Sequence, residues 1–229
     1  MPRLVMVGLS HHATPIEVRE RVAVDEAGWR RYAPEGLGTL LLSTCNRVEV
    51  YAWVEGRPAA IVRSLCRALA RATGVELAEL QPHLRVLTGH EALLHVVRVT
   101  GGLDSLVVGE EQIRGQVREA LAAAKAGESR TLSPELRSIF ERAGESARRI
   151  RSGTSLGKVP SIATAGVNVA HRALGQDLHG KLALVLGAGV MARAAIESLV
   201  GHGARVWVLN RTPANAERIV AHLGTNHVE

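Results

Sequence analysis

Aromatic side chains, cysteines and long apolar runs are all scarce in this chain of 229 residues. Aromatics make up 3% of it, so platforms that stack single-stranded bases are not expected. Two cysteines are too few for a disulfide framework and suit a reducing compartment. No stretch reaches the roughly 18 consecutive apolar residues of a membrane span, and the first apolar run is too short for a signal peptide. We therefore expect a cytoplasmic protein with no membrane partner.

The residues that are abundant predict a globular, basic protein. The hydrophobic share is 46%, enough for a core, and the length suits one large domain or two modest ones. The formal net charge is +6, and residues 114–158 hold ten Lys/Arg against five Asp/Glu. Such an excess favours a polyanionic partner held by its phosphates, or is simply a solvated helical face.

The pattern of elements predicts an α/β chain that begins with an α+β domain. Strands are expected at 3–10, 39–43, 48–54 and 84–89, and helices at 14–24 and 57–74. This order of strand, helix, strand, strand, helix, strand is typical of a ferredoxin-like fold. Thr14 and Pro15 are expected as the N-cap and first residue of the first helix. Further helices are expected at 90–100, 112–126, 133–153 and 162–174, with a linker-like segment at 154–161.

A glycine-rich turn near the end of the chain predicts a partial Rossmann-type domain. A strand at 182–186 leads into the turn, a helix follows, and a second strand is expected at 205–209. In this arrangement the turn holds a pyrophosphate at the helix N-terminus. The cofactor-binding residues expected in the turn are Gly187, Ala188, Gly189, Val190, Met191 and Ala192.

The end of the second Rossmann strand favours NADP(H) over NAD. It carries Asn210, Arg211 and Thr212, where an NAD site usually places a carboxylate for the ribose. Arg211 is suited to pair with a 2′-phosphate, although a solvated loop residue would look the same.

Cys45 lies in the segment STCNR (43–47), between two predicted strands. If residues 44 to 47 are extended, Cys45 and Arg47 point to the same side, and the cation favours the thiolate. A thiolate beside a hydride cofactor suggests that an acyl group is captured as a thioester and reduced to an aldehyde. The alternative is that Cys45 is simply a small residue at a strand end. Cys66 lies inside an amphipathic helix and is interpreted as a packing residue. His95 is compatible with a satisfied core position or a functional one, and Ser105 with an N-cap or a substrate contact.

Four segments in this order resemble the glutamyl-tRNA reductase family. They are GLSHHATPIEVRE, STCNRVEVYA, GGLDSLVVGEEQIRGQVREA and VLGAGVMARAA followed by VLNRT. The resemblance covers essentially the whole chain. It implies NADPH-dependent reduction of glutamyl-tRNA(Glu) to glutamate-1-semialdehyde, the first step of five-carbon tetrapyrrole (porphyrin) biosynthesis. It also implies a homodimer in the full-length family form and a hand-over of the product to an aminomutase, and no metal.

The resemblance assigns roles to individual residues. Cys45 matches the nucleophile that forms the thioester, and His95 matches a histidine important for activity. Arg47 matches a residue suited to clamp the glutamate carboxylate. The other residues that match the substrate-binding segments are Thr44, Asn46, Ser105, Glu110, Glu111, Gln112 and Gln116. The basic helix 133–151 becomes a candidate surface for the tRNA.

Some positions depart from the family pattern. His12 stands where a cation is usual, Glu111 where proline is frequent, and Ala192 where glycine is common. The length also departs. We expect a catalytic domain at 1–155, with a ferredoxin-like core at about 1–100 and a helical part at about 101–155. A truncated NADP-binding domain at 162–229 follows, without the family's dimerisation domain. Alternative functions are a form that binds or hydrolyses glutamyl-tRNA without reducing it, and a regulatory paralogue that is not an enzyme.

Overall fold

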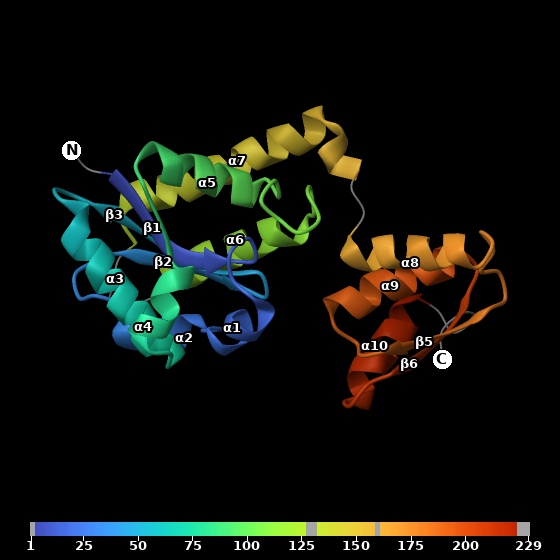
Figure 1. Cartoon of the computed structure of the whole chain (residues 1–229). Coiled ribbons are helices and arrows are strands. Elements are labelled where there is room, and N and C mark those ends of the chain that lie inside the picture. Colours follow the sequence, from blue (N-terminus) through green and yellow to red (C-terminus); the bar gives the residue numbers. More distant parts are fainter. Residues whose placement is uncertain (1–2, 127–131, 159–160, 224–229) are drawn as a thin grey trace. The chain divides into compact units, whose positions relative to one another are not determined.

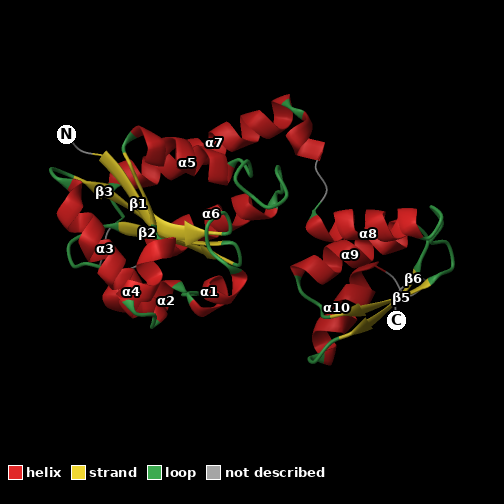
Figure 2. Ribbon diagram, viewed as in Figure 1, coloured by secondary structure: helices red, strands yellow, loops and turns green. Residues whose placement is uncertain are grey.

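The computed structural model describes residues 3–126, 132–158 and 161–223. They belong to two compact units, residues 1–157 and 158–229. Figure 1 traces the chain through both units, and Figure 2 shows that each combines helices with a sheet. Within the described residues, no helix is long and apolar enough to cross a membrane.

The first unit is built on a four-stranded antiparallel sheet. Its strands are β1 (Arg3–Ser10), β2 (Thr39–Thr44), β3 (Arg47–Val54) and β4 (Arg85–Thr88). They stand in the order β2-β3-β1-β4, and every neighbouring pair is antiparallel. This order and the helices between the strands confirm the ferredoxin-like prediction.

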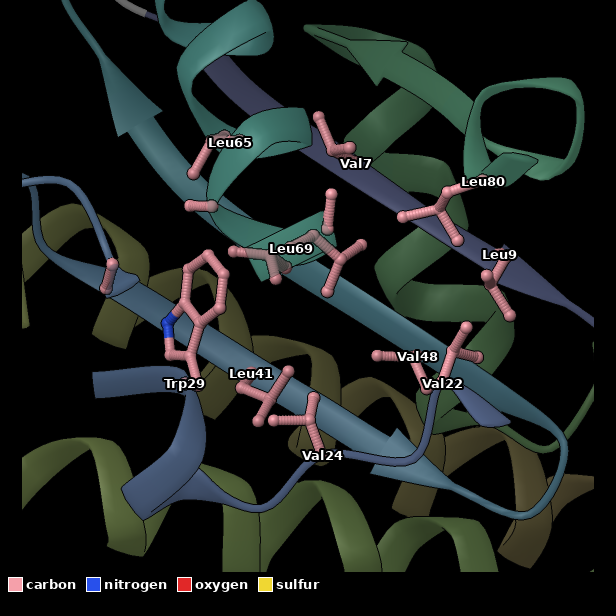
Figure 3. Close-up of a cluster of buried hydrophobic side chains, with 14 of the residues drawn as sticks. Val7, Leu9, Val22, Val24, Trp29, Leu41, Val48, Leu65, Leu69 and Leu80 are labelled. Carbon is pink, nitrogen blue, oxygen red and sulfur yellow. The ribbon is translucent and has the colours of Figure 1, made fainter. Parts of the chain in front are cut away.

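One face of this sheet is covered by the helices that connect its strands. They are α1 (Ile16–Arg21), α2 (Glu26–Tyr32), α3 (Pro58–Thr73) and α4 (Leu77–Leu80), with the 3₁₀ turn η1 (Gln81–His83). Because side chains alternate along a strand, Val5, Val7 and Leu9 all point to this face. There they meet Leu65 and Leu69 of α3 in one buried cluster, drawn in Figure 3.

The opposite face is covered by helices that follow the last strand. They are α5 (His90–Thr100), α6 (Gln112–Lys125) and α7 (Pro134–Gly153). Ser133 accepts a hydrogen bond from the backbone N–H of Leu136 and so caps α7, which begins one residue after the start of the predicted helix. The cluster under these helices contains Leu4 and Met6 of β1. Their side chains alternate with those of Val5 and Val7 and therefore point to this opposite face.

The second unit is a small parallel β-α-β arrangement. After the 3₁₀ turn η2 (Ser155–Lys158), its elements are α8 (Ile162–Ala173), β5 (Leu182–Leu186), α9 (Val190–Gly201), β6 (Arg205–Leu209) and α10 (Pro213–Leu223). The two strands pair in parallel, Leu182 opposite Arg205. This confirms the Rossmann-type prediction for this part of the chain.

The segment after β1 differs from its prediction. In place of one helix at 14–24, α1 begins at Ile16 and ends at Arg21. Pro15 is the N-cap, and the hydroxyl of Thr14 is buried without a hydrogen-bond partner, so Thr14 does not cap the helix. The helix is therefore shorter than predicted by two residues at its N-terminus and by three at its C-terminus.

Helix α2 was not predicted, although the sequence holds its signal. The Asp25 side chain accepts a hydrogen bond of 2.7 Å from the Gly28 backbone N–H, as an N-cap does. Trp29 of this helix is buried and donates its indole N–H to Thr39, so one aromatic residue fixes α2 against the sheet.

Candidate active site

Cys45 lies at the tip of the β2–β3 hairpin. Thr44 pairs with Arg47, so Cys45 and Asn46 form a two-residue turn, and the extended segment over 44–47 that would place Cys45 and Arg47 on one side is not formed. Among the described non-glycine residues only Gln176 has a positive φ, so this turn is not of the primed type that hairpins favour. The Thr44 hydroxyl accepts hydrogen bonds from the N–H groups of Asn46 and Arg47, both at 3.2 Å, and so supports the turn locally.

Arg19 anchors the same turn from helix α1. Its Nη1 donates to the carbonyl oxygen of Cys45 at 2.8 Å and to Oδ1 of Asn46 at 3.0 Å. Its Nε donates to the carbonyl oxygen of Thr14 at 3.2 Å. The backbone N–H of His11 donates to the Asn46 carbonyl at 2.8 Å. The Cys45 side chain is exposed, so the thiol is offered to solvent on a turn whose backbone is fixed from two sides.

The strand after the turn carries polar side chains into the interior. Arg47, Glu49 and Tyr51 alternate along β3 and therefore share one face, the face that α5 covers. Gly8 pairs with Glu49 across the sheet. A Cβ at Gly8 would lie 2.4 Å from the carbonyl oxygen of Val48 and 2.6 Å from Cα of Glu49. Only glycine lets β1 approach β3 this closely behind the buried carboxylate.

Glu49 is the centre of a buried hydrogen-bond network. Its Oε1 accepts from Nη1 of Arg47 and from Nε2 of His95, both at 2.9 Å. Its Oε2 accepts from the Tyr51 hydroxyl at 2.5 Å. An ionised carboxylate can only accept, so the Nε2 of His95 carries a proton. Among the described residues, Nδ1 of His95 has no hydrogen-bond partner.

The contacts within the network keep each of its ionisable groups in the protonation state that its hydrogen bonds require. Burial raises the pKa of the Glu49 carboxyl, but the hydrogen bond from His95 and the charge of Arg47 outweigh burial, and the pKa lies below its usual value. Burial and the Glu49 carboxylate raise the pKa of Tyr51 well above its usual value, so its hydroxyl remains a donor. Burial lowers the pKa of Arg47, but Glu49 and Asp104 outweigh it and keep the guanidinium charged.

Arg47 also ties the loop after α5 to the sheet. Its Nη1 donates to Oδ2 of Asp104 at 3.1 Å and its Nη2 to the Asp104 carbonyl at 2.5 Å. His12 lies 3.3 Å from Oδ1 of the same carboxylate. The Arg47 side chain is 1% exposed, so here it holds a loop rather than facing solvent. A role as the clamp for a substrate carboxylate stays a prediction.

The remaining predicted substrate-binding residues lie on the loop after α5 and the start of α6. Ser105 is buried beside Asp104 in the loop and does not cap a helix, because α6 begins only at Gln112. Glu111 pairs with Arg114 at 2.9 Å, one helical turn away. Gln116 lines a hollow together with Ser43, two residues before Cys45. Glu110 is half-buried and Gln112 is exposed.

The glycine turn of the second unit has the form a pyrophosphate needs. Gly187 has φ +105°, a conformation that favours glycine, and its N–H donates to the Leu209 carbonyl at 2.8 Å. Gly189 caps α9, and a Cβ at either glycine would meet nothing within 4 Å. Val190 and Met191, which open the helix, are exposed. The turn and helix N-terminus are thus open, as a dinucleotide site requires.

The loop after β6 carries an exposed cation, Arg211. Asn210 donates from Nδ2 to the Thr212 carbonyl at 2.7 Å, which shapes the loop. The Arg211 side chain is exposed and has no hydrogen bond or ion pair with the described residues. Within the described residues no group of His, Cys, Asp and Glu is placed to hold a metal ion.

A protein-family profile described as "Glutamyl-tRNAGlu reductase, N-terminal domain" matches residues 7–154. That range is more than half of the chain and contains Cys45, Glu49 and His95. The chain belongs to the glutamyl-tRNA reductase family. A second profile, "Shikimate / quinate 5-dehydrogenase", matches residues 168–229, the glycine turn included, so this part resembles a dehydrogenase's nucleotide-binding domain.

Individual members of the glutamyl-tRNA reductase family support the assignment. The enzyme named glutamyl-tRNA reductase of Deinococcus radiodurans is 43% identical over 231 residues, and that of Syntrophotalea carbinolica is 39% identical over 228. Both alignments cover 96% of this chain, but 61% and 51% of those proteins. The structure of glutamyl-tRNA reductase from Methanopyrus kandleri matches with a TM-score of 0.62 and 35% identity, over 96% of this chain and 52% of that one. The chain thus spans about half the length of several relatives.

Sequence reasoning missed the residues that support the family motif. Arg19 and Asp104 lie inside quoted motifs but gave no sign of their partners. Glu49 did give a sign, because a carboxylate between Val48 and Val50 in an apolar strand must be paired if it is buried. That signal predicts a partner without naming it.

Proposed function

We propose that Cys45 attacks the ester carbonyl of glutamyl-tRNA(Glu), and that the resulting thioester is reduced by NADPH to glutamate-1-semialdehyde. The observation that carries this proposal is the exposed thiol on an anchored turn next to the buried Arg47–Glu49–His95 network. Family membership supports the same chemistry.

The first step forms a carbon–sulfur bond and breaks the ester bond to the terminal ribose. The tRNA hydroxyl leaves with a proton, and the glutamyl group remains on Cys45. Arg19 donates to the carbonyl oxygen of Cys45 and so holds the backbone of the turn that carries the thiol. Glu49 keeps the proton on Nε2 of His95, so Nδ1 is the atom that gives or takes a proton during the exchange.

The second unit fits a phosphorylated dinucleotide. The open Gly187 and Gly189 suit a pyrophosphate, and the exposed Arg211 suits a 2′-phosphate. When bound there, NADPH supplies the hydride that turns the thioester into an aldehyde and frees the thiolate. The family homodimer and the hand-over of the aldehyde to an aminomutase remain predictions.

The test is an assay of the purified chain with glutamyl-tRNA(Glu), with and without NADPH. We expect Cys45-dependent release of deacylated tRNA in both cases and semialdehyde only with NADPH. Cys66→Ser is the matched control and is expected to keep both activities, because Cys66 is a half-buried packing residue. Deacylation that survives Cys45→Ser would contradict the proposed nucleophile.

A further inference from the structure

Helix α3 presents an unneutralised row of arginines on its outer side. Arg63, Arg67 and Arg71 recur every four residues, and the helix holds no Asp or Glu. All three are exposed, and none has a hydrogen bond or ion pair with the described residues. Like charges four residues apart on a helix repel each other. The repulsion between these arginines lowers the stability of the helix, and no acidic group among the described residues offsets it.

The three arginines line one groove. It has a volume of about 500 Å³ and lies where α3 packs on the end of α2. The small residues Ala60 and Ser64 also line the groove. Tyr32 lines it too, and 45% of its surface is exposed. None of the residues that line it is acidic. We call Tyr32, Arg63, Arg67 and Arg71 the arginine groove.

The other basic surface is organised differently. Helix α7 has five arginines but also three glutamates. Arg137 pairs with Glu141 at 3.4 Å, and Arg151 donates to the Gly109 carbonyl. Part of the positive charge of α7 is thus paired with other groups of the protein, whereas Arg63, Arg67 and Arg71 of α3 have no such partner among the described residues.

We propose that the arginine groove binds the phosphate backbone of the tRNA whose ester reacts at Cys45. This inference rests on the proposed function for the identity of the RNA. Arg63 and Arg71 are about 12 Å apart along the helix axis, at 1.5 Å per residue, enough for a short run of phosphates. Guanidinium groups pair well with phosphate, and Tyr32 offers a face on which a base can stack.

The groove also leads toward the thiol. Helix α3 follows β3 and runs back along the sheet, so its C-terminal end approaches the end of β3 that begins at Arg47. Ala72, one residue after Arg71, lines the same hollow as Ser43, which precedes Cys45 by two residues. The C-terminal end of the arginine groove therefore lies at the same end of the sheet as the Cys45 turn.

The test compares two triple variants of the 229-residue chain for binding of deacylated tRNA(Glu) at several salt concentrations. The first is Arg63→Gln, Arg67→Gln and Arg71→Gln. The second is Arg142→Gln, Arg148→Gln and Arg149→Gln on α7, which removes the same charge from exposed positions. We expect the α3 variant to weaken binding at least tenfold and to lower the log–log salt slope by about two to three units, because each lost phosphate contact removes about 0.7–0.9. The α7 variant should change the slope by less than one unit.

Further measurements separate a folding defect and a failure of the proposed function from a failure of the groove. The α3 variant should melt no lower than the parent, because like-charge repulsion is removed, and the corresponding Arg→Lys triple should recover most of the salt slope. Tyr32→Ala should weaken binding about fivefold, and Tyr32→Phe should not.

Acylation of Cys45 by a small activated ester of glutamate, which has no RNA, should be unchanged in the α3 variant. Unaltered tRNA affinity and slope in the α3 variant overturn the groove, whatever Cys45 does. Loss of acylation by every donor overturns the proposed function but leaves an observed change of slope as evidence for the groove.

Discussion

Glu49 decides whether the buried side chains under the Cys45 turn form a network or a set of uncompensated charges. It accepts from Arg47, His95 and Tyr51, which come from one strand and one helix. A buried charge without a partner is far more costly than a paired one. The orientation of His95 and the attachment of the Asp104 loop through Arg47 therefore both depend on this carboxylate.

Replacing Glu49 with Gln should destabilise the protein and flatten its acid dependence. Breaking a buried ion pair costs about 3–5 kcal/mol at neutral pH. The folded pKa of Glu49 lies below its usual value of 4.5, so its stabilising contribution is complete above that pH and is lost as pH falls through the folded pKa. Urea unfolding at a series of pH values checks both effects. Glu20→Gln, at an exposed site on α1, is the control, and an equally steep acid limb in the Glu49 variant would contradict the assignment.

Arg19 is expected to act as a positioning residue for the thiol. Its guanidinium bonds the Cys45 carbonyl and the Asn46 side chain, and hydrogen bonds to charged groups are worth about 1.5–3 kcal/mol. Arg19→Ala should therefore slow acylation of Cys45 about tenfold or more in single-turnover experiments, and Arg19→Lys should recover part of the rate.

The control for Arg19 lies on the same helix. Arg21 pairs with Glu79 at the surface, and such pairs contribute little. Arg21→Ala should leave the acylation rate unchanged. Equal rates for Arg19→Ala and Arg21→Ala would show that the contacts of Arg19 do not position Cys45.

Among the elements, the pairing of β1 with β3 sets the space for the network. Gly8→Ala would place a Cβ against backbone atoms that cannot move alone, so we expect a loss of about 1–3 kcal/mol in the free energy of unfolding. Gly144→Ala in α7 is the matched control. Its Cβ meets nothing within 4 Å, and alanine favours a helix over glycine by about 1 kcal/mol, so this variant should gain stability. The urea midpoint should fall for Gly8→Ala and rise for Gly144→Ala. A lower midpoint in both variants would contradict this prediction.

The loop after β6 should select the phosphorylated cofactor. Arg211→Gln removes the free cation proposed to meet the 2′-phosphate, and we expect about tenfold weaker binding of NADPH with little change for NADH. Cofactor fluorescence titration measures both. Arg172→Gln, exposed on α8, controls for the lost charge. A parallel loss for NADPH and NADH would place Arg211 outside the 2′-phosphate site.

At the scale of the whole molecule, local signals predicted the elements better than the site. The strands expected at 3–10 and 48–54 and the glycine turn after β5 are encoded by a few neighbouring residues, and each formed within one residue of its expected position. The two-residue turn at Cys45 was missed because Cys45-Asn46 is not one of the glycine-containing pairs typical of tight hairpins, and neither residue has a positive φ. The bonds of Glu49 to His95 and of Arg19 to Cys45 join residues 46 and 26 positions apart, which depends on sheet register and helix docking rather than on local pattern.

The most direct measurement is the mass of the peptide that contains Cys45 after acid quench of the chain mixed with glutamyl-tRNA(Glu) and no NADPH. The account predicts one glutamyl group on Cys45, removed by hydroxylamine and absent in Cys45→Ser. Cys66 should stay unmodified, because burial raises the pKa of its thiol. A chain that releases tRNA with no adduct on Cys45, or with the adduct on Cys66, would contradict it.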